Sequence, residues 1–245
     1  FNLYDIIKNI KNLLKERFCM KERNIFWDNF KGILIFLVVF AHFLYAYRSL
    51  SSSFASHLVN FIYFFHMPAF VFTTGYFSRS ENSNKPTAYL KLLVYYMIFN
   101  TILIIYGLLV SGSISVTVPR YSYWYLLSMI FWRLIIRPLS KIKFLLPISI
   151  FVSLLIGFYP GINNTLSIVR TLAFFPFFVL GYKFDFKLFK EKVNKKKVLK
   201  AISIVVSLII FAIVFYIACN ASFSLNDILF FRYSNNFAFI KRVFL

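Results

Sequence analysis

Apolar residues are gathered into seven runs separated by short polar connections. The runs cover residues 32–48, 58–78, 89–110, 122–137, 144–159, 165–182 and 199–219. A helix needs about 20 apolar residues to cross a bilayer, and about 17 to 25 is the usual range. The first, fourth and fifth runs need flanking residues to reach that length. The pattern predicts an all-α, polytopic transmembrane helix bundle of about seven spans.

The two ends of the chain depart from this pattern. Within residues 3–18, apolar side chains recur at helical spacing and lysines occupy the rest of the helix circumference, which predicts an amphipathic helix on the membrane surface. Residues 228–245 are interrupted by Arg, Asn and Lys and predict only a partial C-terminal segment. We expect residues 1–20 to form a cytoplasmic amphipathic helix, or an extension before a start at Met20, and residues 21–245 to form the transmembrane domain.

Basic residues are concentrated in every second connection. They lie mainly in residues 21–31, 79–91, 137–143 and 183–200. The connections between them are rich in Ser, Gly or Asn and carry little charge, and these are residues 49–56, 111–123 and 159–165. By the positive-inside rule, this alternation predicts a multi-pass protein of the inner (plasma) membrane with a cytoplasmic N-terminus. The lysine-rich run 183–200 is interpreted as a solvated or lipid-facing loop.

Composition narrows the class of protein further. The 245 residues are 60% hydrophobic and 22% aromatic, with 34 Phe, which is typical of an integral membrane protein. The Lys and Arg residues that give the net charge of +20 lie between apolar runs and do not form one patch. This distribution therefore indicates contacts with membrane lipids and no nucleic acid partner. Cys19 and Cys219 are far apart, so neither a disulfide framework nor a metal site is predicted, and no permanently bound cofactor is expected.

A histidine lies deep within the first apolar run. Ionisable groups are costly inside a bilayer, so such a residue is a functional-site hypothesis. His42 follows Lys31 by eleven residues, and at about 100° per residue the two share one helix face. Asp28 and Tyr45 extend the same face at steps of three. The spacing predicts a polar track that enters the membrane from one side.

A second histidine, His66, lies in the next run, two residues before Pro68. With a rise of 1.5 Å per residue, His42 and His66 both fall near the midplane of a core about 30 Å thick. An imidazole at that depth can take a proton from a hydroxyl or become transiently acylated. In the alternative interpretation, each histidine bonds a carbonyl and only fixes packing.

Two arginines lie near the edges of later runs. Arg170 sits slightly inside the outer edge of its helix, where it could serve a site or extend to the outer interface. Arg133 follows Trp132 near the inner edge, where it could meet a phosphate or act as a positive-inside anchor.

Several blocks, taken in order, resemble a known family. They are 28–32 with 38–42, 65–70 with 75–76, 123–127 with 131–133, and 170–171 with 174–178 and 181–182. These blocks resemble the membrane acyltransferase-3 family, and most closely its fucose 4-O-acetylase-like sugar O-acetyltransferases. The family's signature pairs a basic residue, usually Arg, with a histidine further along the helix, and here the pair is Lys31 and His42. Members usually have more spans, so we expect this chain to be truncated at its C-terminus.

The resemblance implies an O-acetyltransferase that moves an acetyl group from cytoplasmic acetyl-CoA to a hydroxyl of a glycan. The acceptor would be a cell-surface or lipid-linked glycan such as a capsule-type polysaccharide. The implied site residues are His42 as general base or acetyl relay, His66 as its assistant, Asp28, Lys31 and Arg133 at the donor, and Arg170 at the acceptor or oxyanion. Two alternatives stay open: a polysaccharide or lipid exporter whose histidines line a path, and an inactive truncated membrane subunit.

Overall fold

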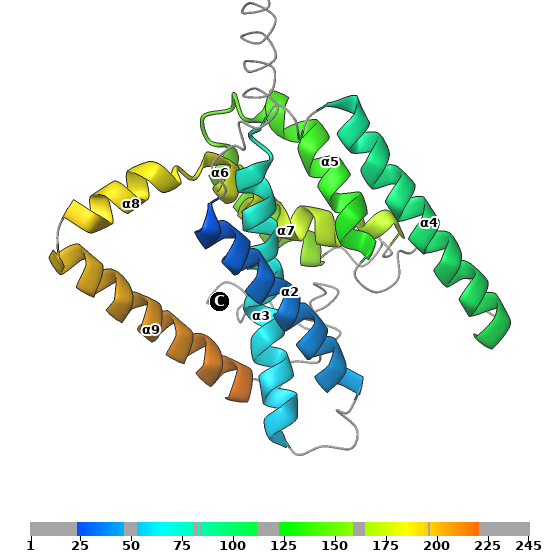
Figure 1. Cartoon of the computed structure of the whole chain (residues 1–245), viewed down its shortest axis with the longest axis horizontal. Helices are drawn as coiled ribbons and strands as arrows, with labels where there is room; N and C mark the ends of the chain where they lie inside the picture. Colours follow the sequence, from blue (N-terminus) through cyan, green and yellow to red (C-terminus); the bar gives the residue numbers. More distant parts are fainter. Residues whose placement is uncertain are drawn as a thin grey trace, which may run out of the picture.

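The computed structural model describes residues 24–46, 53–80, 83, 85–111, 123–158, 165–195 and 197–220. Within these ranges every regular element is a helix (Figure 1), which confirms the all-α class. The seven apolar runs form α2 (Ile25–Ala46), α3 (Ser53–Phe77), α4 (Pro86–Ser111), α5 (Trp124–Leu139), α6 (Leu145–Leu155), α7 (Ile168–Lys183) and α9 (Lys197–Asn220). Short 3-10 turns flank the connection between α6 and α7, at Ile156–Phe158 and Thr165–Ser167. The helix predicted for residues 3–18 and the partial segment 228–245 lie outside the described residues.

Four of the described helices are long and apolar enough to cross a membrane. The segments are Ile25–Tyr45, Phe54–Phe77, Pro86–Val110 and Val198–Tyr216. With 16, 11 and 16 residues, α5, α6 and α7 reach only about 16 to 24 Å, less than a hydrocarbon core of about 30 Å. In Figure 1, α7 also lies across α3 and not alongside it. The prediction of about seven spans is therefore not confirmed.

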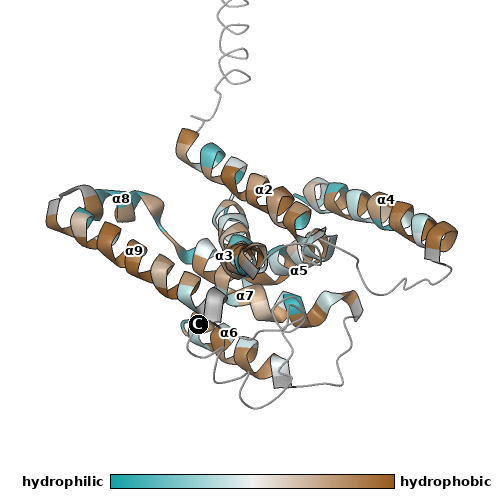
Figure 2. Ribbon diagram, turned by 90° about the horizontal axis from the view of Figure 1, so that it is seen from below, coloured by the Kyte–Doolittle hydropathy of each residue, from teal (hydrophilic) through white to brown (hydrophobic). Residues whose placement is uncertain are grey.

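The lysine-rich segment contains a helix, α8 (Phe186–Lys195), so the prediction of a loop is wrong there. The Asp185 carboxylate caps this helix by accepting hydrogen bonds from the backbone N–H groups of Lys187 (2.9 Å) and Leu188 (3.1 Å). The ring of Phe186 stacks on Phe26 of α2, with 5.1 Å between centroids. Figure 2 shows hydrophilic positions on α8, whereas α9 is hydrophobic along most of its length. A cap and aromatic contacts thus hold a helix that charge alone suggested was a loop.

Helix α3 is central, because it packs against α2, α7 and α9 (Figure 1). Its crossing with α7 is very close, and two glycines permit it. A Cβ atom on Gly75 would collide with the carbonyl oxygen of Phe178, and one on Gly181 would collide with the carbonyl oxygen of Phe72. Small residues let helix backbones touch in an apolar medium, where packing carries much of the association free energy. The two glycines therefore fix where α3 and α7 cross.

Hydrogen bonds from side chains of α5 and α6 join these two helices to α7. The hydroxyl oxygens of Ser128 and Thr171 lie 2.6 Å apart, and Trp132 Nε1 donates to the Thr171 carbonyl at 2.9 Å. From α6, Ser153 Oγ donates to the Ala173 carbonyl at 2.8 Å. These buried bonds satisfy polar groups that would otherwise be costly among apolar side chains. They make α5, α6 and α7 one packed unit, and α7 joins this unit to α3.

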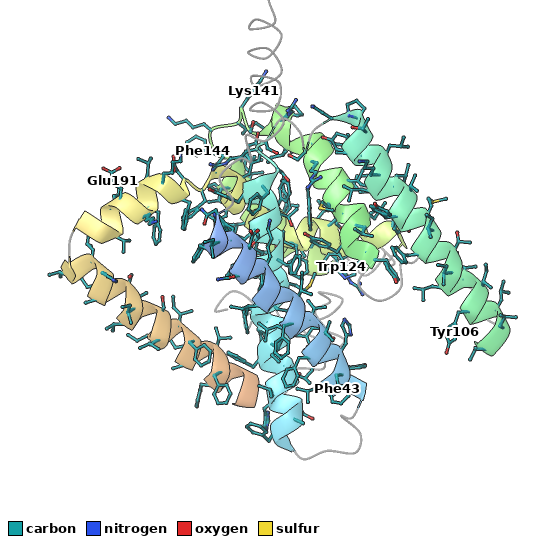
Figure 3. All side chains as sticks on the ribbon, in the orientation of Figure 1. Phe43, Tyr106, Trp124, Lys141, Phe144 and Glu191 are labelled. Carbon is teal, nitrogen blue, oxygen red and sulfur yellow. The ribbon has the colours of Figure 1, made fainter. Side chains whose placement is uncertain are left out.

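Helix ends that lie next to basic residues are found on one side of the molecule. α3 ends and α4 begins near the top of Figure 1, and Figure 3 labels Lys141 at the same end. α2 and α4 end, and α3 begins, toward the opposite end of the molecule (Figure 1). The end of α3, the beginning of α4 and Lys141 therefore lie on one side, as an alternating arrangement of basic loops requires.

The glycine crossing generates a prediction about stability. Gly75→Ala and Gly181→Ala should each lower the free energy of unfolding by about 1–3 kcal/mol, the usual cost of overpacking, because the two backbones must separate. Gly32→Ala in α2 is the matched control, since nothing lies within 4 Å of the Cβ it would add. The measurement is denaturant or thermal unfolding in detergent micelles. Equal stability of all three variants would contradict the crossing.

The position of the basic helix ends on one side generates a prediction about orientation in the membrane. In a background with Cys19 and Cys219 replaced by serine, Lys141→Cys should be protected from an impermeant thiol reagent in intact cells. Ser113→Cys, which lies beyond the described end of α4, should react with the same reagent. Labelling after the cells are opened provides the control that both cysteines are reactive. The opposite pattern would reverse the proposed cytoplasmic side.

Candidate functional site

Helices α2 and α3 run in opposite directions and place the two predicted histidines at corresponding positions. At one end of the pair, Lys31 Nζ lies 3.5 Å from the centroid of the Phe77 ring. His42 follows Lys31 by eleven residues, and His66 precedes Phe77 by the same number. Each histidine is therefore about 16 Å along its helix from the basic end.

Tyr63 lies between the two histidines. Its hydroxyl oxygen is 3.4 Å from His42 Nδ1, and the two rings are nearly perpendicular at 89°, with centroids 6.1 Å apart. On the other side, its ring meets His66 edge-on, with a centroid distance of 5.1 Å. The sequence interpretation missed Tyr63. Its signal is its position three residues before His66, which puts both side chains on neighbouring parts of one helix surface.

His66 is buried, with 2% of its surface exposed. Its Nδ1 lies 2.6 Å from the carbonyl oxygen of Ile62, one turn earlier in α3. A carbonyl oxygen can only accept, so Nδ1 carries the hydrogen and Nε2 of the neutral ring holds the free lone pair. His42 is exposed, and its contact with the Tyr63 hydroxyl fits either tautomer, because a hydroxyl can donate or accept.

Three cations gather around the last turn of α3. Lys31 lies over an aromatic ring of that turn, as described above. Arg133 Nε donates to the hydroxyl of Ser78 at 3.2 Å, so the structure brings this predicted residue to the same end as Lys31. Arg79, which the sequence interpretation did not include, donates through Nε to the carbonyl oxygen of Tyr182. The sequence signal for Arg79 is its place at the basic end of the second apolar run.

Asp28 lies at this basic end too, partly buried in the first turn of α2, where a negative charge stabilises the helix N-terminus. Its neighbour Trp27 stacks on Tyr76 of α3, with centroids 4.4 Å apart. The indole Nε1 of Trp27 is buried and has no hydrogen-bond partner among the described residues. Buried polar groups nearly always have a partner, so this end offers a donor that a ligand could use.

Arg170 lies elsewhere, near the beginning of α7. Its guanidinium is 5.4 Å from the centroid of the Trp124 ring of α5, a cation–π contact. Trp124 in turn stacks on Phe174. Figure 3 shows Trp124 well apart from Phe43, the neighbour of His42. Arg170 is thus held on the side of the molecule formed by α5 and α7, and its role at the acceptor or oxyanion stays a prediction.

Another buried polar atom lies on the far side of the histidines from Lys31. Asn60 is 9% exposed, and its Oδ1 has no hydrogen-bond partner among the described residues. It precedes Tyr63 by three residues. The sequence interpretation missed this amide, although an Asn inside an apolar run is a visible signal. Within the described residues, no three His, Cys, Asp or Glu side chains come together as a metal site would require.

The site is therefore a pair of imidazoles with a phenol between them, reached along α2 from a basic end. Such groups can take a proton from a hydroxyl, donate one or carry an acyl group. The cations at the basic end can bind phosphates, Arg as a planar fork and Lys as a point charge.

Comparison with known proteins assigns the family. The model of the acyltransferase domain family, acyltransferase-3, matches residues 24–243, which include every described helix and both histidines. No characterised protein and no solved structure gives a significant match. The match covers the family as a whole, so the fucose 4-O-acetylase-like branch is not confirmed. With four helices able to span a membrane and a family match over most of its length, the chain belongs to the membrane acyltransferase-3 family and is a membrane acyltransferase.

Proposed function

We propose that the protein is an O-acetyltransferase that uses cytoplasmic acetyl-CoA to acetylate a hydroxyl of a cell-surface or lipid-linked glycan, with the fucose 4-O-acetylase-like enzymes as its nearest branch. The observation that carries the proposal is the pair His42 and His66 with Tyr63 between them, inside two apolar helices and in line with a basic end. This combination suits acyl transfer from acetyl-CoA to a hydroxyl, because the donor is an anionic cofactor and the acceptor must lose a proton.

The basic end is the proposed site for CoA. Its phosphates would be bound by Lys31, Arg79 and Arg133, three cations around one helix turn. Trp27 Nε1 offers a further hydrogen-bond donor at this end. The long, flexible pantetheine arm of CoA would then follow the shared face of Lys31 and His42 for about 16 Å into the membrane. In this arrangement the thioester reaches the histidines while the nucleotide stays at the surface.

The chemistry at the two histidines needs little more than positioning and proton transfer, since a thioester is already activated. We assign His42 as general base or acetyl relay and His66 as the residue that assists or orients it. Arg170 is assigned to the acceptor or to the developing oxyanion, where a fixed positive charge stabilises the transition state.

The donor site can be tested by removing one charge. Lys31→Met keeps the length of the side chain and its contact with the Phe77 ring but loses the ammonium. We expect the KM for acetyl-CoA in membrane preparations to rise about tenfold, which corresponds to about 1.4 kcal/mol. Lys187→Met, on the exposed surface of α8, removes a charge from the part of α8 that lies near the beginning of α2 and serves as the control. An unchanged KM in Lys31→Met would remove the proposed role.

The function itself is tested at His42. His42→Ala should lower O-acetylation by about 10²- to 10⁴-fold, the usual contribution of general acid–base catalysis. Base and relay roles both need a ring nitrogen, so His42→Gln, which keeps a polar group of similar reach, should be equally inactive. The measurement is NMR of O-acetyl groups on the surface glycan at matched membrane abundance.

Two outcomes would contradict this proposal. Near-normal acetylation by His42→Gln would mean that His42 is only a packing residue. Glycan that reaches the cell surface through the protein without any dependence on acetyl-CoA would instead favour an exporter.

A further inference from the structure

We propose that His66, through Nε2, is the base that accepts the proton of the acceptor hydroxyl, which leaves His42 for the donor side. This assignment rests on the acyl transfer proposed above and reverses the division of roles that the helix face of Lys31 and His42 suggested. It comes from the hydrogen bond between His66 Nδ1 and the Ile62 carbonyl oxygen, at 2.6 Å.

The hydrogen bond defines the tautomer of His66. Ile62 can only accept through its carbonyl, so the ring hydrogen is on Nδ1 and the lone pair is on Nε2. Enzymes that use histidine as a base orient it in the same way, with one nitrogen donating to a fixed acceptor and the other turned toward the reacting group. His66 therefore already has the protonation pattern of a base.

The contact of His42 with Tyr63 does not define a tautomer. The separation of 3.4 Å is long for a hydrogen bond to a hydroxyl. The hydroxyl can also donate to Nδ1, and His42 would then carry its hydrogen on Nε2 and have no free lone pair. An exposed imidazole in line with Lys31 suits contact with the thioester.

A purely structural role for His66 is the competing explanation. Other side chains of α3 also bond the carbonyl four residues earlier: Thr73 to Ala69 at 2.8 Å, Thr74 to Phe70 at 3.0 Å and Ser78 to Thr74 at 2.7 Å. The hydrogen bond alone therefore does not distinguish a base from a packing residue. What distinguishes His66 is its second nitrogen, which those hydroxyl side chains do not have, on a ring that packs edge-on against Tyr63.

In the proposed step, the acetyl group passes from the thioester to the acceptor hydroxyl. The acceptor oxygen attacks the carbonyl carbon of the thioester and its proton moves to His66 Nε2. The new C–O bond forms, the C–S bond breaks, and the sulfur leaves with the bonding pair as the CoA thiolate. A lasting imidazolium would be costly at a buried position, so the proton passes on to the thiolate and the neutral ring returns. If His42 carries the acyl group first, its ring nitrogen replaces sulfur as the leaving atom.

The decisive variant is His66→Asn. Its amide nitrogen can occupy the position of Nδ1 and keep the bond to the Ile62 carbonyl, but nothing replaces Nε2. His66→Gln is the second variant, and it carries an amide near the position of Nε2 that cannot act as a base. His57→Asn makes the same chemical change near the beginning of α3 and is the matched control.

The assay measures acetyl transfer from radiolabelled acetyl-CoA to surface glycan extracted from the same cells, across a range of pH, in membranes with matched protein abundance. We expect His66→Asn to melt like the wild-type protein and to transfer about 10²- to 10⁴-fold more slowly, while His57→Asn stays at the wild-type rate. The wild-type rate should level off as pH rises, whereas the residual rate of His66→Asn should keep rising with hydroxide. A structural role would lower the rate without this change in the pH profile.

The outcomes separate the two proposals. If either His66 variant transfers within threefold of the wild-type rate, or if the slow variants keep the wild-type pH profile, His66 is not the base. If the wild-type protein itself shows no transfer that depends on acetyl-CoA, the proposed function fails. Should His66→Asn not accumulate in the membrane, the rate and pH profile of His66→Gln decide the question in the same way.

Discussion

The backbone contact between α3 and α7 at Gly75 and Gly181 is the constraint on which the rest of the structure depends. In an apolar medium, helices are not driven together by exclusion of water, so close packing and hydrogen bonds must hold them. The two glycines permit the packing, and the bonds from α5 and α6 to α7 add the polar part. Because α3 also carries His66 and the turn that gathers the cations, this crossing positions both ends of the site.

The polar side chains of the site occupy different environments along α2 and α3, and this difference follows from the cost of polar groups among apolar ones. At the basic end, Lys31 and Arg133 contact aromatic and hydroxyl groups and stay near the surface. Deeper in the pair, His66 is buried and satisfied by its own helix. In the proposed reaction, the first environment suits a charged donor that approaches from one side. The second keeps the proposed base, His66, among apolar side chains.

The sequence by itself determined the helical class, the seven apolar helices and the shared face of Lys31 and His42. These properties are local, because they depend on hydropathy and on the 100° turn per residue. The helical rise predicted matched depths for His42 and His66, and in the structure both contact Tyr63, His42 from α2 and His66 from the same helix, α3. The ordered blocks also indicated the acyltransferase-3 family, which the match over residues 24–243 confirms.

Only the tertiary structure decided what depends on contacts between helices. The crossing of α7 over α3 is one case, since hydropathy does not reveal that angle. The helix α8 is another, because the stacking of Phe186 on Phe26 joins segments far apart in the chain. The place of Tyr63 beside His42, and the convergence of Arg79 with Arg133, likewise arise from register and crossing angle. Side-chain packing sets both quantities, and no local pattern of residues encodes them.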